Sequence, residues 1–137
     1  MIPEIQTAVP KVSVVFPVFN EEGNIRPVHE RVSEALSETE LDYELIFVDD
    51  GSSDSSLEII KDLSGRDHHV RYVSLSRNFG HQAALFAGMK HSRGAAVITM
   101  DADLQHPPSL IPKMVRFWRQ GHDVVFTMKS NQRLGLF

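Results

Sequence analysis

The sequence contains no cysteine among its 137 residues. A disulfide framework and thiolate metal sites are therefore excluded, and the composition is compatible with a reducing compartment. No apolar run approaches the roughly 18 residues of a transmembrane helix, and the start of the chain lacks the basic segment and apolar core of a secretory signal peptide. We therefore expect the chain as given to be a soluble, cytoplasmic protein.

An excess of positive charge is also absent. The formal net charge is -4 at pH 7, which argues against binding to nucleic acid through a basic surface, so nucleic acid is not an expected partner. The glycine fingerprint G-x-G-x-x-G of dinucleotide-binding folds and the P-loop of ATPases are missing as well. A phosphorylated ligand must then be held by a few local side chains.

What the sequence does contain is a regular alternation of apolar runs and amphipathic stretches. The pattern predicts strands over 12–19, 43–48, 70–75, 95–100 and 123–127, with helices over 25–36, from 55 onward, over 81–91 and over 110–118. Ser55 and Glu58 stand at capping-box spacing where the second helix starts. Repeated strand–helix units predict an α/β fold with a doubly wound, mainly parallel sheet. We expect a flexible segment over 1–10, one domain over 11–128 and a tail over 129–137.

An acidic pair follows the predicted strand 95–100 directly. Asp101 and Asp103 come at its carboxyl end, where α/β proteins bind ligands in a crevice. Adjacent carboxylates repel each other unless a cation or several donors compensate them, and hard divalent ions take carboxylate oxygens together with water and substrate phosphates. Gln105 adds a third oxygen ligand, and Pro107-Pro108 is typical of a helix start. Although D-x-D also occurs in solvated turns, this context indicates a Mg2+ or Mn2+ site for a phosphorylated substrate.

A polar loop over 17–24 follows the first predicted strand. It suits the start of a helix, with Asn20 or Asn24 as the cap and the neighbouring glutamates favoured near the helix N-terminus. It equally suits a ligand loop, in which Pro17 and Phe19 form a flat apolar wall for a base. The residues alone leave both interpretations open.

The second and third predicted strands also end in polar loops. Asp49 and Asp50 stand where dinucleotide folds place a carboxylate on ribose hydroxyls. The loop over 76–82 is either a strand-to-helix turn shaped by glycine or a ligand loop in which Arg77 pairs with a diphosphate or with the acidic residues. Several other histidines show no metal-ligand spacing and are expected at the surface: His29, His68, His69, His91 and His122.

Four of these segments together resemble family 2 glycosyltransferases, and their order and spacing match over about residues 11–128. The segments are VVFPVFNEE (14–22), VDDGSSD (48–54), RNFG (77–80) and DADLQHPP (101–108). The RNFG loop and the glutamine after the acidic pair resemble the polyprenyl-phosphate group of that family. This group includes dolichol-phosphate mannose synthases and bactoprenol glucosyltransferases.

The resemblance implies a GT-A fold that binds a UDP- or GDP-sugar at the switch point between the first and fourth strands. It implies that Pro17, Phe19 and Glu21 border the nucleoside. It implies further that Asp50 contacts the base or the ribose, and that Asp101 lies near the ribose and the metal.

The same resemblance implies the chemistry of the metal site. Asp103 and Gln105, beside Asp101, are implied as the ligands of Mg2+ or Mn2+, which stabilises the departing nucleotide as a Lewis acid. The implied reaction transfers a hexose from the nucleotide sugar to a polyprenyl phosphate. In a full-length protein it takes place at the cytoplasmic face of a membrane.

Members of the family continue beyond the length of this chain, with an acceptor-side acidic residue, an arginine-rich loop and membrane-associated helices. We therefore expect a truncated, donor-binding half of such an enzyme, which binds a nucleotide sugar but does not transfer it alone. The alternative is a noncatalytic nucleotide-sugar-binding module. A phosphoacceptor receiver domain is disfavoured, because its acidic pair and aspartate follow strands one and three, whereas here the carboxylates follow strands two and four.

Overall fold

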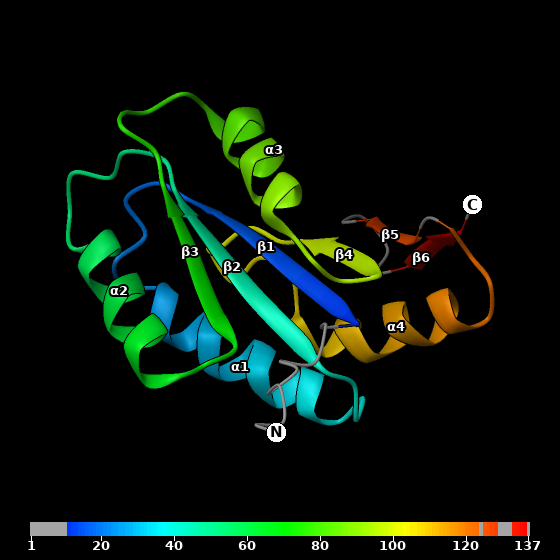
Figure 1. Ribbon diagram of the computed structural model, residues 1–137. Coiled ribbons are helices and arrows are strands. Elements are labelled where there is room, and N and C mark those ends of the chain that lie inside the picture. Colours follow the sequence, from blue (N-terminus) through cyan, green and yellow to red (C-terminus); the bar gives the residue numbers. More distant parts are fainter. Residues whose placement is uncertain (1–10, 124, 129–132, 137) are drawn as a thin grey trace, which may run out of the picture.

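The computed structural model describes residues 11–123, 125–128 and 133–136 as alternating strands and helices (Figure 1). The elements are β1 (Val12–Val18), α1 (Ile25–Ser37), β2 (Tyr43–Asp49), α2 (Ser56–Arg66), β3 (Val70–Ser74), α3 (His81–His91), β4 (Ala96–Thr99), the 3-10 turn η1 (Pro108–Leu110), α4 (Ile111–Arg119), β5 (Val125–Met128) and β6 (Arg133–Leu136). The predicted alternation is confirmed through β5. The expected flexible segment 1–10, and 129–132 and 137 of the expected tail, lie outside the described residues. Within the described part, no helix is both long and apolar enough to span a bilayer.

The first four strands form one parallel sheet in the order β3-β2-β1-β4. Val12 of β1 pairs with Tyr43 on one side and with Ala96 on the other. The chain winds from β1 outward to β3 and then returns past β1 to β4, so the winding direction reverses between β1 and β4. This reversal opens a crevice at the carboxyl ends of the strands. The predicted doubly wound sheet and its switch point are confirmed.

Helices cover both faces of the sheet, which is why its strands are nearly continuous apolar runs (Figure 1). On the face covered by α1, α2 and α4, Phe16 and Phe47 stack with ring centroids 4.8 Å apart. On the other face, α3 packs against Val15 and Val48. Gly88 permits this approach, because a Cβ there would lie 2.2 Å from Cγ1 of Val15.

The end of the described chain differs from the prediction. β5 does not extend the parallel sheet but pairs antiparallel with β6 in a separate two-stranded sheet. The sequence predicted no element over 133–136. Four residues that include Gly135 are too short a pattern to be distinguished from an apolar tail, because strand periodicity needs several alternations to show.

A buried carboxylate ties the amino-terminal part of the sheet together. Glu44 of β2 is 3% exposed and accepts hydrogen bonds from Ser13 Oγ at 2.8 Å, from the Arg93 N–H at 2.8 Å and from the Arg71 guanidinium. Burial raises the pKa of the Glu44 carboxyl, but the bonds from Arg93, Arg71 and Ser13 outweigh it and hold that pKa below its ordinary value. Glu44 thus joins β1 and β3 to the chain that leads into β4.

Glu44→Gln is expected to lower the free energy of unfolding by about 2 kcal/mol at neutral pH, because charged hydrogen bonds become neutral ones. A carboxyl whose pKa is depressed by folding stabilises the protein above its unfolded pKa, and this stabilisation is lost as the pH falls through the folded pKa. The two proteins should therefore converge in acid. Urea unfolding across the acidic range measures this, with the exposed Glu34→Gln as control. Parallel pH profiles for Glu44→Gln and the unmodified chain would contradict the assignment.

Candidate donor-binding cleft

An open cleft of about 320 Å3 lies where the carboxyl ends of the parallel strands meet. The loops after β1, β2, β3 and β4 all contribute to it. Its lining residues are Pro17, Val18, Phe19, Glu21, Asp50, Asn78, Gly80, His81, Asp101, Ala102 and Asp103. Six of the predicted site residues therefore share one cleft: Pro17, Phe19, Glu21, Asp50, Asp101 and Asp103.

The acidic pair forms the β4 side of the cleft. Asp101 and Asp103 are both partly buried, and Ala102 between them is packed into the core. Leu104 has φ +64°, which turns the chain sharply after the pair, and the Gln105 N–H donates to Asp103 Oδ1 at 3.1 Å. Gln105 is exposed and does not line the cleft. The turn thus presents two carboxylates, two residues apart in the sequence, to the cleft.

His81 is a cleft residue that the sequence reasoning missed. It is the first residue of α3, and its Nε2 lies 3.0 Å from Asp101 Oδ1. The sequence did hold one indication of this position, because His81 directly follows Gly80 at the start of a predicted helix. The His81 ring can donate a hydrogen bond to the Asp101 carboxylate, which accepts only.

Asp50 lies at the floor of the cleft and also holds one of its walls. It is 3% exposed, and its two carboxylate oxygens accept hydrogen bonds from the Phe79 N–H at 2.7 Å and the Gly80 N–H at 3.1 Å. Arg77 of the same loop stands over the Phe79 ring, with its Cζ 4.1 Å from the ring centroid, and is not a lining residue. Asp50 therefore fixes the loop after β3 through its backbone.

The loops after β1 and β2 are joined to each other by side chains. Asn20 Oδ1 accepts from the Ser53 N–H at 2.8 Å, and Glu22 Oε2 accepts from the Ser55 N–H at 2.9 Å. Asn24 and Ser55 are the N-cap residues of α1 and α2, as predicted, but among the described residues neither makes a side-chain cap bond to its own helix. The bonds to Asn20 and Glu22 cross from one loop to the other, which makes the two loops one unit.

The doubly wound parallel sheet of this chain, with the acidic pair at the carboxyl end of β4, has the GT-A fold of solved glycosyltransferases. The mannosyltransferase PcManGT from Pyrobaculum calidifontis, solved in complex with GDP-Man and Mn2+, shares this fold. It superimposes with a TM-score of 0.74 at 21% identity, and the match covers 88% of this chain and 36% of that chain.

The chain belongs to glycosyl transferase family 2, whose sequence model matches residues 13–131. It is 44% identical over 121 residues to the uncharacterized glycosyltransferase YkcC of Bacillus subtilis (strain 168). The aligned residues cover 88% of this chain and 38% of that protein. It is also 44% identical over 124 residues to the undecaprenyl-phosphate 4-deoxy-4-formamido-L-arabinose transferase of Proteus mirabilis (strain HI4320). That alignment covers 90% of this chain and 38% of that protein. The chain thus spans well under half the length of these relatives.

Proposed function

We propose that this chain binds the nucleoside diphosphate sugar for a transferase that moves a hexose onto a polyprenyl phosphate. The observation that carries the proposal is the single cleft that Asp101 and Asp103 share with Pro17 and Phe19. A nucleotide sugar needs a flat apolar contact for its base and a charged site for its diphosphate, and this cleft offers both. Membership of family 2 and the undecaprenyl-phosphate transferase among its relatives support the reaction.

The nucleoside is assigned to the β1 and β2 side of the cleft. Phe19 is 48% exposed and free to stack on a base beside Pro17, and Glu21 borders the same position. Each carboxylate oxygen of Asp50 accepts one backbone N–H and retains a lone pair, so Asp50 can also accept a hydrogen bond from the ribose or the base. Arg77, exposed on the Phe79 ring next to the cleft, is assigned to the diphosphate.

Mg2+ or Mn2+ is assigned to the acidic turn. Two carboxylates from one turn, Asp101 and Asp103, suit a hard dication that completes its shell with water and substrate phosphate oxygens. Gln105, on the same turn, is the third proposed ligand. When bound, the ion neutralises charge on the departing nucleoside diphosphate. The GDP-Man and Mn2+ complex of PcManGT supports this choice of ion.

The proposed reaction is a substitution at the anomeric carbon of the sugar. A phosphate oxygen of the acceptor bonds to that carbon, the bond from that carbon to the diphosphate oxygen breaks, and the nucleoside diphosphate leaves with the electron pair. The acceptor is a polyprenyl phosphate, reached by the full-length protein at the cytoplasmic face of a membrane. Labelled hexose in the organic-extractable lipid, formed by the full-length protein only when polyprenyl phosphate is supplied, is the expected result.

Titration calorimetry on the 137-residue chain tests donor binding directly. UDP-glucose and GDP-mannose are titrated in Mn2+ and in chelator, and UMP and GMP serve as controls that lack the diphosphate. At least one donor should bind in Mn2+ and bind much more weakly in chelator, while the monophosphates show little dependence on the ion. If neither donor binds a chain that circular dichroism shows to be folded, the proposal is wrong.

A further inference from the structure

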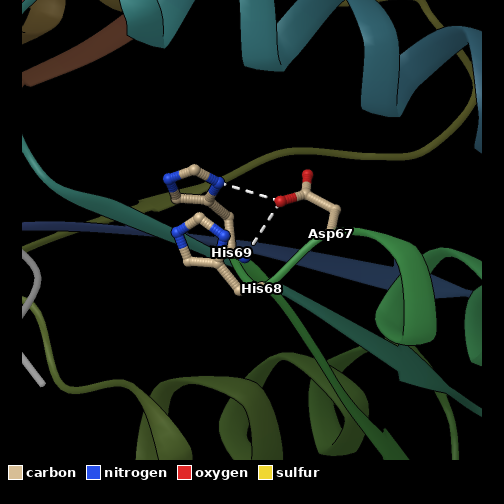
Figure 2. Close-up of side chains that lie close together, drawn as sticks. All are labelled: Asp67, His68 and His69. Atoms are coloured by element: carbon tan, nitrogen blue, oxygen red, sulfur yellow. Dashed lines mark hydrogen bonds and ion pairs between the residues drawn. The ribbon is translucent and has the colours of Figure 1, made fainter.

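A second cluster of ligating side chains lies at the α2–β3 turn. Asp67 caps the end of α2, and His68 and His69 complete the turn before β3. One ligand atom from each of the three lies within 4.8 Å of the other two. Figure 2 shows the two imidazole rings next to each other beside the Asp67 carboxylate. Their centroids are 4.1 Å apart and their planes are tilted by 33°. In the part of the chain that the structure describes, these residues are the one such grouping of histidine, aspartate and glutamate.

A third imidazole reaches the same carboxylate from α1. His29 Nε2 lies 2.8 Å from Asp67 Oδ2, and His69 Nδ1 lies 2.8 Å from Asp67 Oδ1. His68 is exposed, as expected, but His29 and His69 are only partly exposed, and the expectation that these histidines are simple surface residues is wrong for those two. Sequence spacing gave no signal, because His29 is 38 residues from Asp67 and adjacent histidines in an extended chain would point apart.

The geometry of the cluster is supported by its surroundings. Tyr43 stacks on the His69 ring with centroids 4.0 Å apart and an angle of 5° between the planes. The His69 N–H donates to Asp67 Oδ1 at 3.0 Å, and the Asp67 N–H donates to the Leu63 carbonyl at 2.8 Å. Ligands held in this way by packing and backbone bonds lose little freedom when an ion binds.

We propose that Asp67, His68 and His69, with His29 behind the carboxylate, bind a transition-metal dication of the Zn2+ or Co2+ class. Imidazole nitrogen is the preferred side-chain ligand of these ions, whereas Mg2+ and Mn2+ prefer oxygen. The cluster therefore differs in chemistry from the oxygen ligands of the cleft. The ion takes the place of the proton shared by His69 Nδ1 and Asp67 Oδ1, and the bond from His29 orients the carboxylate from outside.

The site is structural and separate from the donor cleft. The turn precedes β3, whereas the cleft residues Asn78 and Gly80 follow it, so the two lie at opposite ends of that strand (Figure 1). An ion here links α1, through His29, to the α2–β3 turn. We expect it to raise the thermal midpoint of unfolding without being required for nucleotide binding.

Metal titration of the chelator-treated 137-residue chain tests the proposal. We expect one Zn2+ per chain, visible absorption bands from bound Co2+, and retention of Co2+ in excess Mg2+. His69→Asn places an amide N–H near the former Nδ1, so it keeps the bond to Asp67 while removing the nitrogen ligand. It should weaken Zn2+ binding by about 10-fold or more.

Two further variants keep the result decisive if His69→Asn disturbs folding. His68 is exposed, so His68→Ala should leave the circular dichroism spectrum unchanged and still weaken Zn2+ binding. The matched control is His91→Asn, an exposed histidine on α3, which should bind Zn2+ as the unmodified chain does. Absence of the Co2+ bands, or equal Zn2+ affinity in His68→Ala and His91→Asn, overturns the proposal.

Discussion

Asp103→Asn is expected to lower the affinity for the nucleoside diphosphate sugar in Mn2+ roughly 100-fold, or about 2.8 kcal/mol. Asparagine keeps an oxygen that can accept the hydrogen bond from the Gln105 N–H, so the acidic turn persists. The cleft loses one negative charge, and a neutral amide is a weaker ligand than a carboxylate for a hard dication. The affinity in chelator should not change, so the dependence on the ion disappears.

Calorimetry measures the donor affinity of each variant in Mn2+ and in chelator. Glu30→Gln removes the same charge from an exposed position on α1 and is the matched control, because it separates loss of a metal ligand from a general change in net charge. The metal assignment fails if Asp103→Asn retains the Mn2+ dependence of the unmodified chain. It also fails if Glu30→Gln loses that dependence equally.

Gly51→Ala is expected to cost about 3 kcal/mol of unfolding free energy, the sum of a left-handed backbone penalty and overpacking. Gly51 has φ +72°, and a Cβ there would lie 2.4 Å from the Asn78 backbone nitrogen and 2.5 Å from the Arg77 carbonyl carbon. Relief of this overlap requires the loop after β3 to move away from β2. The hydrogen bonds that Asp50 accepts from that loop are then lost, so donor binding should fall as well.

Chemical unfolding and donor titration of the same preparation measure the two effects. Gly23→Ala is the control, since a Cβ there meets nothing within 4 Å and its backbone lies outside the left-handed region. It should match the unmodified chain in both measurements. Wild-type stability together with wild-type donor affinity in Gly51→Ala would show that the loop tolerates displacement and that the cleft does not depend on it.

Residues near the ends of predicted strands were placed well by sequence reasoning. Asp101 and Asp103 follow β4, Asp50 follows β2, and Pro17 and Phe19 lie at the end of β1, and all of them line one cleft. This works because the carboxyl ends of parallel strands share one edge of a sheet, so a residue's position along its own strand decides where it lies. Their roles in donor binding stay predictions that the titrations test.

Side chains on longer loops were placed less well. Arg77 and Gln105 were predicted as ligands, yet neither lines the cleft, whereas the unpredicted His81 does. The direction of a loop side chain depends on turn geometry and on local partners. For Arg77 the partner is the Phe79 ring, and for Gln105 the left-handed Leu104 sets the turn.

The sequence by itself determined the alternation of strands and helices, the single parallel sheet, and the gathering of acidic residues at one edge. Those features follow from local periodicity and from the common direction of the strands. Only the tertiary structure decided which distant groups meet: His81 with Asp101, Asn20 with Ser53, and His29 with Asp67. These pairs are 20 to 38 residues apart and join different loops or helices, so their contacts depend on how separate elements pack, which no local pattern encodes.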